Sequence, residues 1–267
     1  MFKNLCFLVS AFIFLGSCNK DVNDFLQDTF RVREIISYPL KNESWADSNR
    51  LTYDTENHLV KTEKYNASGL ISYAGMKWDN SRLQEIQRFD LDSASSEFIP
   101  VYHAINFYDS TGDLIMMFQE AVLNDTFHFY YSAGQLVKIT SGPVTGLGYN
   151  LNYLSGNASS VVRYHVENGN NLLIDSIAYL YDGRINPFYN PAFIFYDLPV
   201  HEMVSWLSKN NLVGEYSYQK INGEWSEKYS VFHIFQYTAY DYPSLCLKFP
   251  RASNKSSATN YFYEKTQ

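Results

Sequence analysis

Hydrophobic and polar residues alternate with a period of two along most of the chain beyond about residue 29. Residues 136–139 (Leu-Val-Lys-Ile) and 161–166 (Val-Val-Arg-Tyr-His-Val) are two clear runs of this kind. Such runs, when turn-forming residues bound them, are typical of antiparallel strands. The pattern therefore predicts an all-β chain, with about a dozen strands between Arg31 and Tyr263 in an antiparallel β-meander.

A recurring phrase marks the predicted turns. An aromatic residue, usually followed by Asp, precedes two or three turn-forming residues and then a strand that begins with Leu or another aliphatic residue. The clearest copies start at Tyr53, Trp78, Tyr108, Tyr131 and Tyr181, and weaker copies start at Tyr153 and Tyr240. An Asp in such a turn can accept hydrogen bonds from backbone amides, while Gly or Asn takes a position with positive φ. We expect each aromatic ring to lie across the hairpin from the aliphatic residue that follows.

One segment departs from the strand pattern, at residues 199–208. Val200, Met203, Val204 and Leu207 have helical spacing, and Pro199 suits a first helical turn. The segment predicts a short helix that packs its apolar stripe over the sheet or plugs the open end of the sheet. A helix that binds a partner is the alternative.

The first eighteen residues have the pattern of a bacterial lipoprotein signal. Lys3 precedes an apolar run from Leu5 to Leu15, and Gly16, Ser17 and Cys18 follow. A run of about eleven apolar residues is too short to cross a bilayer and is typical of a cleaved signal. We expect cleavage between Ser17 and Cys18 and a lipid on Cys18, whose acyl chains, such as palmitate, would hold the mature protein on the membrane. An ordinary secretory signal or an uncleaved anchor is the alternative.

The expected organisation is a signal peptide at 1–17, a tether at 18–28 and one β-meander domain at 29–267. Of the three cysteines, only Cys246 then remains in the folded part, so no internal disulfide is expected. Cys246 lies in an apolar run, which favours a buried, unreactive thiol over a nucleophile.

Composition and charge narrow the possible functions. The chain has 23 Tyr and 19 Phe, which favour strands because their rings pack well on a pleated sheet. The formal net charge is −7, and no cluster of Lys and Arg interrupts the acidic balance. Nucleic acid is therefore not expected as a partner.

The sequence contains no catalytic motif. None of the six histidines stands at the His-x-x-x-His spacing of metal ligands. Carboxylate pairs such as Asp90/Asp92 and Asp109/Asp113 could serve a glycosidase or bind calcium, but turn caps are the favoured interpretation. We expect no metal site and no cofactor, and a non-enzymatic role is favoured over an enzyme.

The aromatic-Asp phrase resembles the YD repeats of rearrangement-hotspot proteins. The order of the later motifs, at residues 181–188, 207–211 and 240–243, is similar to that of small Bacteroidota lipoproteins of unknown function with a porin-like fold. The resemblance covers roughly Arg31 to Tyr263 and implies a sheet that curls into an open or closed barrel. It does not imply a pore, because charged residues such as Lys61 and Glu63 recur within strands, whereas membrane-spanning barrels need apolar positions towards the lipid.

These observations favour a lipid-anchored, non-catalytic binding or scaffold protein of the bacterial outer membrane, on its periplasmic face or at the cell surface. The expected partners are the membrane, through the lipid on Cys18, and a glycan or an envelope protein. The candidate ligand-facing aromatics are Tyr102, Tyr149, Trp225 and Tyr229, which lie near predicted turns. The alternative is an envelope glycan or peptide hydrolase with two carboxylates in a cleft, and a purely structural lipoprotein is a third possibility.

Overall fold

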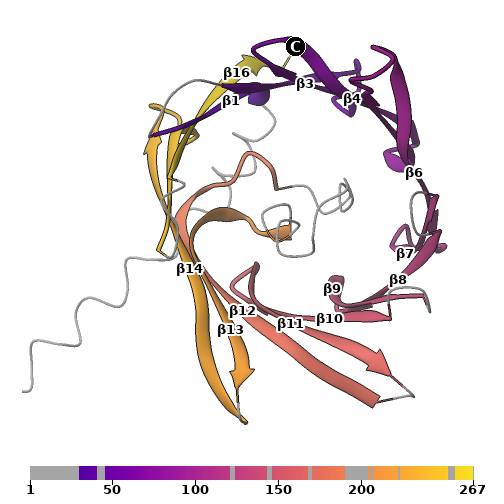
Figure 1. Cartoon of the computed structure of the whole chain (residues 1–267), viewed down its shortest axis with the longest axis vertical. Helices are drawn as coiled ribbons and strands as arrows, with labels where there is room; N and C mark the ends of the chain where they lie inside the picture. Colours follow the sequence, from indigo (N-terminus) through magenta and orange to yellow (C-terminus); the bar gives the residue numbers. More distant parts are fainter. Residues whose placement is uncertain are drawn as a thin grey trace, which may run out of the picture.

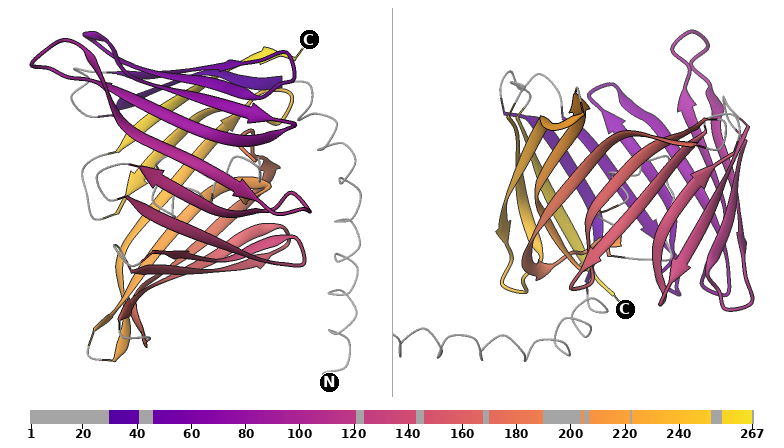
Figure 2. Two further views of the ribbon diagram at one scale, coloured as in Figure 1. Left: turned by 90° about the vertical axis from the view of Figure 1, so that its right-hand side faces the viewer. Right: turned by 90° about the horizontal axis from the view of Figure 1, so that it is seen from below.

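Sixteen strands form a closed antiparallel barrel in the computed structural model (Figure 1). Each strand pairs with its neighbours in chain order, and β1 pairs with β16 to complete the ring. The strands cross the wall obliquely (Figure 2), as the closure of a sheet into a barrel requires. The predicted all-β class and antiparallel meander are confirmed, and the sheet is closed.

The structure describes residues 30–40, 46–120, 124–142, 146–167, 170–189, 204, 207–221, 223–251 and 256–266. The strands are β1 (Phe30–Pro39), β2 (Asp47–Tyr53), β3 (Leu59–Asn66), β4 (Gly69–Asp79), β5 (Arg82–Leu91), β6 (Phe98–Tyr108), β7 (Leu114–Glu120), β8 (Asp125–Ser132), β9 (Gln135–Ser141), β10 (Leu147–Leu154), β11 (Asn157–Glu167), β12 (Asn170–Ile185), β13 (Asn210–Ile221), β14 (Glu224–Tyr237), β15 (Pro243–Pro250) and β16 (Ser257–Lys265). The predicted signal peptide and tether, with Ser17 and Cys18, lie outside the described residues. Within the described ranges, no helix has the length and apolar character needed to span a membrane.

The predicted number of about a dozen strands is too low, since the described residues alone form sixteen. The aromatic-Asp phrase marks turns that lead from an even-numbered strand to the next odd-numbered strand, and these lie at one end of the barrel. Turns at the other end, such as the one between Asn66 and Gly69, lack the phrase. The sequence pattern therefore undercounts the hairpins at that second end.

The predicted helix at residues 199–208 falls mostly outside the described residues. Val204 and Leu207 each have a helical backbone conformation, but the described residues form no helical element. Both side chains are buried in the same apolar cluster as Ala158 and Tyr179 of the wall. The described parts of the connection between β12 and β13 turn into the barrel interior (Figure 1). The predicted position against the sheet is therefore confirmed for these two residues, and a helix is not.

The predicted geometry of the repeated turns is confirmed. The aromatic and the following aliphatic residue are directly paired across their hairpins in four copies: Tyr53 with Leu59, Trp78 with Leu83, Tyr108 with Leu114 and Tyr131 with Leu136. The four leucines are buried in the core. This pairing directs the repeated aromatic rings to the inner face at one end of the barrel.

Aspartates cap these turns as predicted. The Oδ1 atom of Asp109 accepts hydrogen bonds from the amides of Thr111, Gly112 and Asp113 at 2.8, 2.9 and 3.0 Å. The Thr111 hydroxyl donates to the same oxygen, and with the backbone amides it outweighs burial and lowers the pKa of Asp109. Gly112 has a φ of 96°, which other residues rarely adopt. The phrase is thus a self-contained turn.

The repeated aromatic residues also link neighbouring strands through their polar atoms. Four of them donate a hydrogen bond to a backbone carbonyl of the preceding strand: Tyr53 to Val32 (2.9 Å), Trp78 to Leu59 (2.8 Å), Tyr108 to Leu83 (2.7 Å) and Tyr181 to Ala158 (2.6 Å). Burial raises the pKa of the three tyrosines, to about 12 for Tyr108. The hydroxyls therefore remain protonated donors at neutral pH.

Candidate ligand pocket in the barrel lumen

A cavity of about 530 Å³ opens inside the barrel, between the inner faces of β13 to β16 and the segment that follows β12. Its volume is in the range of small-molecule pockets. Aromatic, amide and charged side chains share its lining. The lining residues are Asn186, Phe188, Asn211, Leu212, Glu215, Tyr229, Val231, His233, Phe235, Pro243, Cys246, Lys248 and Tyr261.

Strand register explains why these side chains meet. Residues directly opposite each other on neighbouring strands share a face, and successive residues alternate between faces. Val231 lies opposite Glu215, His233 opposite Lys248 and Phe235 opposite Cys246. Alternate residues of β14 therefore line the lumen, while Phe232 and Ile234 point outwards.

His233 and Cys246 form a neutral pair in this lining. The Nδ1 atom of His233 lies 3.6 Å from the Sγ atom of Cys246. Burial, followed by the charge of Lys248, lowers the pKa of His233 to about 4, and burial raises the pKa of Cys246 to about 12. A thiolate is the reactive form of cysteine. The pair therefore presents a thiol and a neutral imidazole near pH 7, in keeping with an unreactive cysteine.

Tyr229, Glu215 and Lys248 contribute to the polar part of the lining. Burial and the nearby carboxylate of Glu215, to which Tyr229 is hydrogen-bonded, raise the pKa of Tyr229 to about 12. Tyr229 thus remains a phenol at neutral pH. Glu215 and Lys248 add an acceptor and a donor of opposite charge on the same wall.

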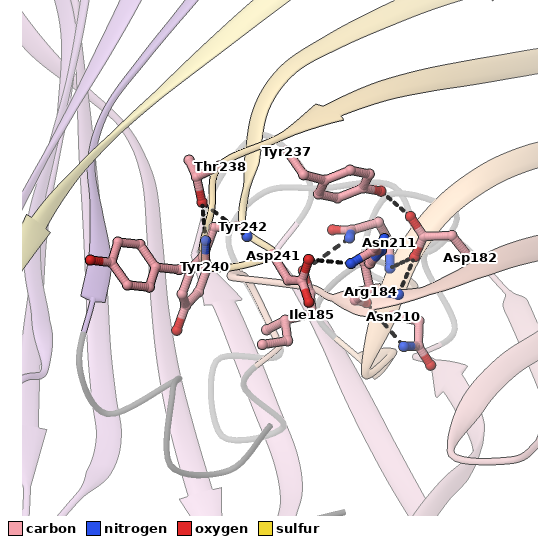
Figure 3. Close-up of polar contacts among 10 residues, drawn as sticks. All are labelled: Asp182, Arg184, Ile185, Asn210, Asn211, Tyr237, Thr238, Tyr240, Asp241 and Tyr242. Atoms are coloured by element: carbon pink, nitrogen blue, oxygen red, sulfur yellow. Dashed lines mark hydrogen bonds and ion pairs between the residues drawn. The ribbon is translucent and has the colours of Figure 1, made fainter. Parts of the chain in front are cut away.

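A polar network at the edge of the cavity holds the ends of β12, β13 and β14 together (Figure 3). We call Asp182, Arg184, Asn211, Tyr237 and Asp241 the clamp. The carboxylate of Asp182 accepts hydrogen bonds from the Tyr237 hydroxyl and, at 3.2 Å, from the backbone N–H of Asn211. Arg184 forms an ion pair with Asp241. The clamp brings together the three motifs, at residues 181–188, 207–211 and 240–243, that the sequence singled out.

A second set of hydrogen bonds joins the residues at the end of β12 to those at the start of β13. Asn186 donates to the carbonyl of Ser208 at 2.7 Å, and the Asn211 side chain donates to the carbonyl of Ile185 at 2.9 Å. The Ser208 hydroxyl lies 2.9 Å from that of Tyr181. These bonds join the end of β12 to the start of β13, so that Asn186 and Asn211 stand at fixed positions in the pocket lining.

The four predicted ligand-facing aromatics lie in different places. Tyr229 lines the cavity. Tyr102 is buried in the core, where its hydroxyl faces the sulfur of Met117, and Tyr149 packs against the same core. Trp225 lies at the tip of the β13–β14 hairpin and is 48% exposed. The structure therefore brings one of the four into the pocket.

Sequence reasoning missed most of the pocket. Phe235, Lys248 and Tyr261 were not singled out, and His233 was considered only as one of six histidines without the spacing of metal ligands. The available signal was the period of two in residues 229–235, which places every second side chain on one face. Among the described residues, no three His, Cys, Asp or Glu side chains are grouped as metal ligands.

Comparisons with known proteins define the fold. The barrel is similar to the crystal structure of a porin-like protein from Bacteroides uniformis, with a TM-score of 0.54, 10% identity and coverage of 89% of this chain and 97% of that one. A porin-like protein from Bacteroides vulgatus is similar at 11% identity, with a TM-score of 0.42 and coverage of 88% and 98%. No family model and no curated protein matches the sequence. The chain thus shares a porin-like barrel fold with a Bacteroides protein.

Proposed function

We propose that this protein is a lipid-anchored binding module of the bacterial outer membrane that holds a small polar ligand, such as the end of a glycan, in the barrel lumen. The observation that carries the proposal is the mixed lining of the 530 Å³ cavity. A porin-like barrel fold is compatible with a location in the envelope. The signal pattern that ends in Cys18 supports the lipid anchor.

The lining has the chemistry that sugars require. Phe188, Tyr229, Phe235 and Tyr261 supply rings that can stack on the apolar face of a pyranose. Asn186, Asn211, Glu215 and Lys248 supply donors and acceptors for hydroxyl groups. The combination favours a polar ligand with a flat apolar side over a purely apolar one.

The position of the cavity favours a small ligand over a folded protein. A stable protein interface buries about 800 Å² on each partner, which requires an accessible surface. A site within the lumen instead admits a free small molecule or the end of an extended chain. We therefore propose a glycan end ahead of an envelope protein as the ligand.

The hydrolase alternative requires a second carboxylate. A glycosidase of the usual kind needs two carboxyl groups about 5 to 10 Å apart. Among the described residues of the lining, Glu215 is the single carboxylate. The cavity therefore supports binding better than hydrolysis.

The test is binding of the purified mature protein to a panel of bacterial envelope and host oligosaccharides. We expect at least one oligosaccharide to bind, and Tyr229→Leu and Glu215→Gln to weaken it at least tenfold. Trp225→Ala, an aromatic substitution at a hairpin tip outside the pocket, is the matched control and should bind like the wild type. Equal losses in all three variants, or no binding by the wild type, would contradict the lumen site. Mass spectrometry of the N-terminal peptide tests the lipid on Cys18 separately.

A further inference from the structure

The outer surface of the barrel is apolar along one side. Opposed outward positions pair Phe232 with Phe249 and Ile234 with Leu247, and Leu180 lies across Gly214 from Phe232. Ile234 is 56% exposed and Leu180 52% exposed. We define the apolar wall as the outward side chains Ile36, Tyr38, Leu180, Tyr216, Phe232, Ile234, Leu245, Leu247, Phe249 and Phe262.

The uncharged polar side chains of Gln236 and Asn260 lie among the residues of the apolar wall, on either side of Leu245. The wall is bounded on β1 by Glu34, which lies opposite Phe262 and forms an ion pair with Arg50 of β2. The opposite side of the barrel carries more charge. The outward faces of β3 to β7 carry ion pairs that connect adjacent positions: Lys61 with Glu63 (2.7 Å), Lys77 with Glu85 (2.5 Å), and His103 with Glu85 (3.0 Å) and Glu120 (2.8 Å). A smaller apolar group around Phe107 on β6 is bordered by His103 and Glu120. The barrel therefore has one apolar side, on β12 to β16 and β1, and one charged side.

An exposed apolar surface of this extent marks a contact with a partner or a membrane. An upright barrel that spans a bilayer would place Lys77, Glu85 and their neighbours in hydrocarbon, which is costly. A closed barrel satisfies its own backbone hydrogen bonds, so one side can lie against lipid without unpaired backbone groups. A second copy of the protein fits the apolar wall less well than a membrane does, because two convex barrel surfaces touch only along a narrow strip.

The length of chain that precedes the barrel also favours a membrane as the partner of the apolar wall. This step rests on the lipid anchor of the proposed function. Between Cys18 and Phe30 lie residues 19–29, which reach at most about 40 Å when extended. They lead into β1, which itself contributes Ile36 and Tyr38 to the apolar wall. A short tether that ends at the border of the wall keeps the wall near the membrane surface.

We infer that the protein lies on its side, with the apolar wall seated in the phospholipid leaflet that holds the anchor and the charged side in water. The contact is lateral, so it leaves the barrel interior and its ligand pocket outside the hydrocarbon. The membrane then orients the pocket as well as retaining the protein.

Photo-cross-linking of the full chain in its own cells tests this inference. The photoreactive residue p-benzoylphenylalanine replaces Phe232 or Phe262, which are 37% and 39% exposed on the apolar wall. Phe107, 42% exposed and eight strands away around the ring from Phe232, is the matched control. We expect phospholipid adducts at 232 and 262, at least fivefold above the level at 107.

Each other outcome overturns the inference. An adduct with twice the mass of the chain would show that a second copy covers the wall, and an adduct with another protein would show a protein partner. No adduct at 232 and 262, or equal lipid adducts at all three positions, would show that the wall is not selectively in lipid. The mass of the N-terminal peptide from the same samples reports the lipid on Cys18. An N-terminal peptide without lipid would overturn the anchor of the proposed function. The cross-links at 232 and 262 would still test whether the apolar wall contacts lipid.

Discussion

At one end of the barrel, hydrogen bonds from the repeated aromatic side chains connect adjacent strands and contribute to stability. The Tyr181 hydroxyl donates to the carbonyl of Ala158 and also contacts the Ser208 hydroxyl, so a single group links the wall to the chain inside the lumen. A buried carbonyl that loses its donor costs more than the mean value of a hydrogen bond, because water cannot replace the donor.

Removal of this hydroxyl tests the role of the repeated aromatics. We predict that Tyr181→Phe lowers the free energy of unfolding by about 1 to 3 kcal/mol, measured by urea denaturation. Tyr130→Phe, at an exposed outward tyrosine, is the control and should change it by less than about 0.5 kcal/mol. Equal effects of the two substitutions would refute the structural role of the Tyr181 hydroxyl.

Burial of His233 should make the stability depend on pH. Its pKa is lowered from 6.5 to about 4, so between these values the unfolded chain binds more protons than the folded one. The free energy of unfolding should therefore fall as the pH falls from about 6.5 towards 4, by up to about 3 kcal/mol from this residue.

Urea denaturation at pH 7 and at pH 4.5 measures this loss. We predict that His233→Gln loses about 2 kcal/mol less than the wild type over this interval. His128→Gln, at an exposed histidine of β8, should retain the wild-type loss. A wild-type loss that persists in His233→Gln would disprove the assignment to His233.

At the scale of strands, one glycine makes room for an aromatic ring. Gly148 on β10 pairs with Tyr164 on β11, and a Cβ atom at Gly148 would overlap the Tyr164 ring. Gly75 on β4 has no atom within 4 Å of a Cβ atom at that position. The two glycines therefore differ in packing although both lie within strands.

Alanine substitution separates the two cases. We predict that Gly148→Ala destabilises the protein by about 1 to 3 kcal/mol through overpacking, whereas Gly75→Ala is neutral or slightly stabilising. Thermal unfolding compares the two. In a Tyr164→Ala background, Gly148→Ala should cost much less stability than it does in the wild type, because the ring that the methyl group meets is gone. An equal cost of Gly148→Ala in both backgrounds would argue against the ring contact.

Features that depend on a few neighbouring residues could be predicted from the sequence, whereas features that depend on the register between strands could not. The aromatic-Asp phrase predicted the turn geometry at Tyr53, Trp78 and Tyr108, because each turn is a local arrangement of a few residues. The pocket depends on the register between β13, β14, β15 and β16, which no local pattern specifies. The clamp likewise depends on register, because Asp182 contacts Tyr237, 55 positions away in the chain, only when β12, β13 and β14 are paired as they are here.

At the scale of the whole molecule, the pairing of β1 with β16 decides whether a lumen exists. Ser37 lies opposite Thr259, with their hydroxyl oxygens 3.0 Å apart. Cys246 lies opposite Thr259 on the other side. A disulfide across β1 and β16 would therefore report closure, provided that Cys246 is removed.

We predict that Ser37→Cys with Thr259→Cys, in a Cys246→Ala background, forms a disulfide that stabilises the barrel by as much as about 5 kcal/mol, because it closes a loop of most of the chain. Thermal unfolding with and without reductant measures the gain. Ser37→Cys with Ser257→Cys is the register control, since Ser257 lies opposite Pro39, and it should not cross-link. Cross-linking of the control alone would contradict the register.

Occupation of the lumen is the central claim, and protection of Cys246 measures it most directly. Cys246 lines the pocket and is the single cysteine after residue 18. Because burial raises the pKa of its thiol to about 12, the reaction with methyl methanethiosulfonate is slow near pH 7, and its rate at pH 9 reports access of the reagent to the cavity. We predict that an oligosaccharide from the binding panel slows this reaction at least fivefold in the wild type and does not slow it in Tyr229→Leu. An oligosaccharide that binds the protein yet leaves the rate for Cys246 unchanged would place the ligand outside the lumen and contradict the account.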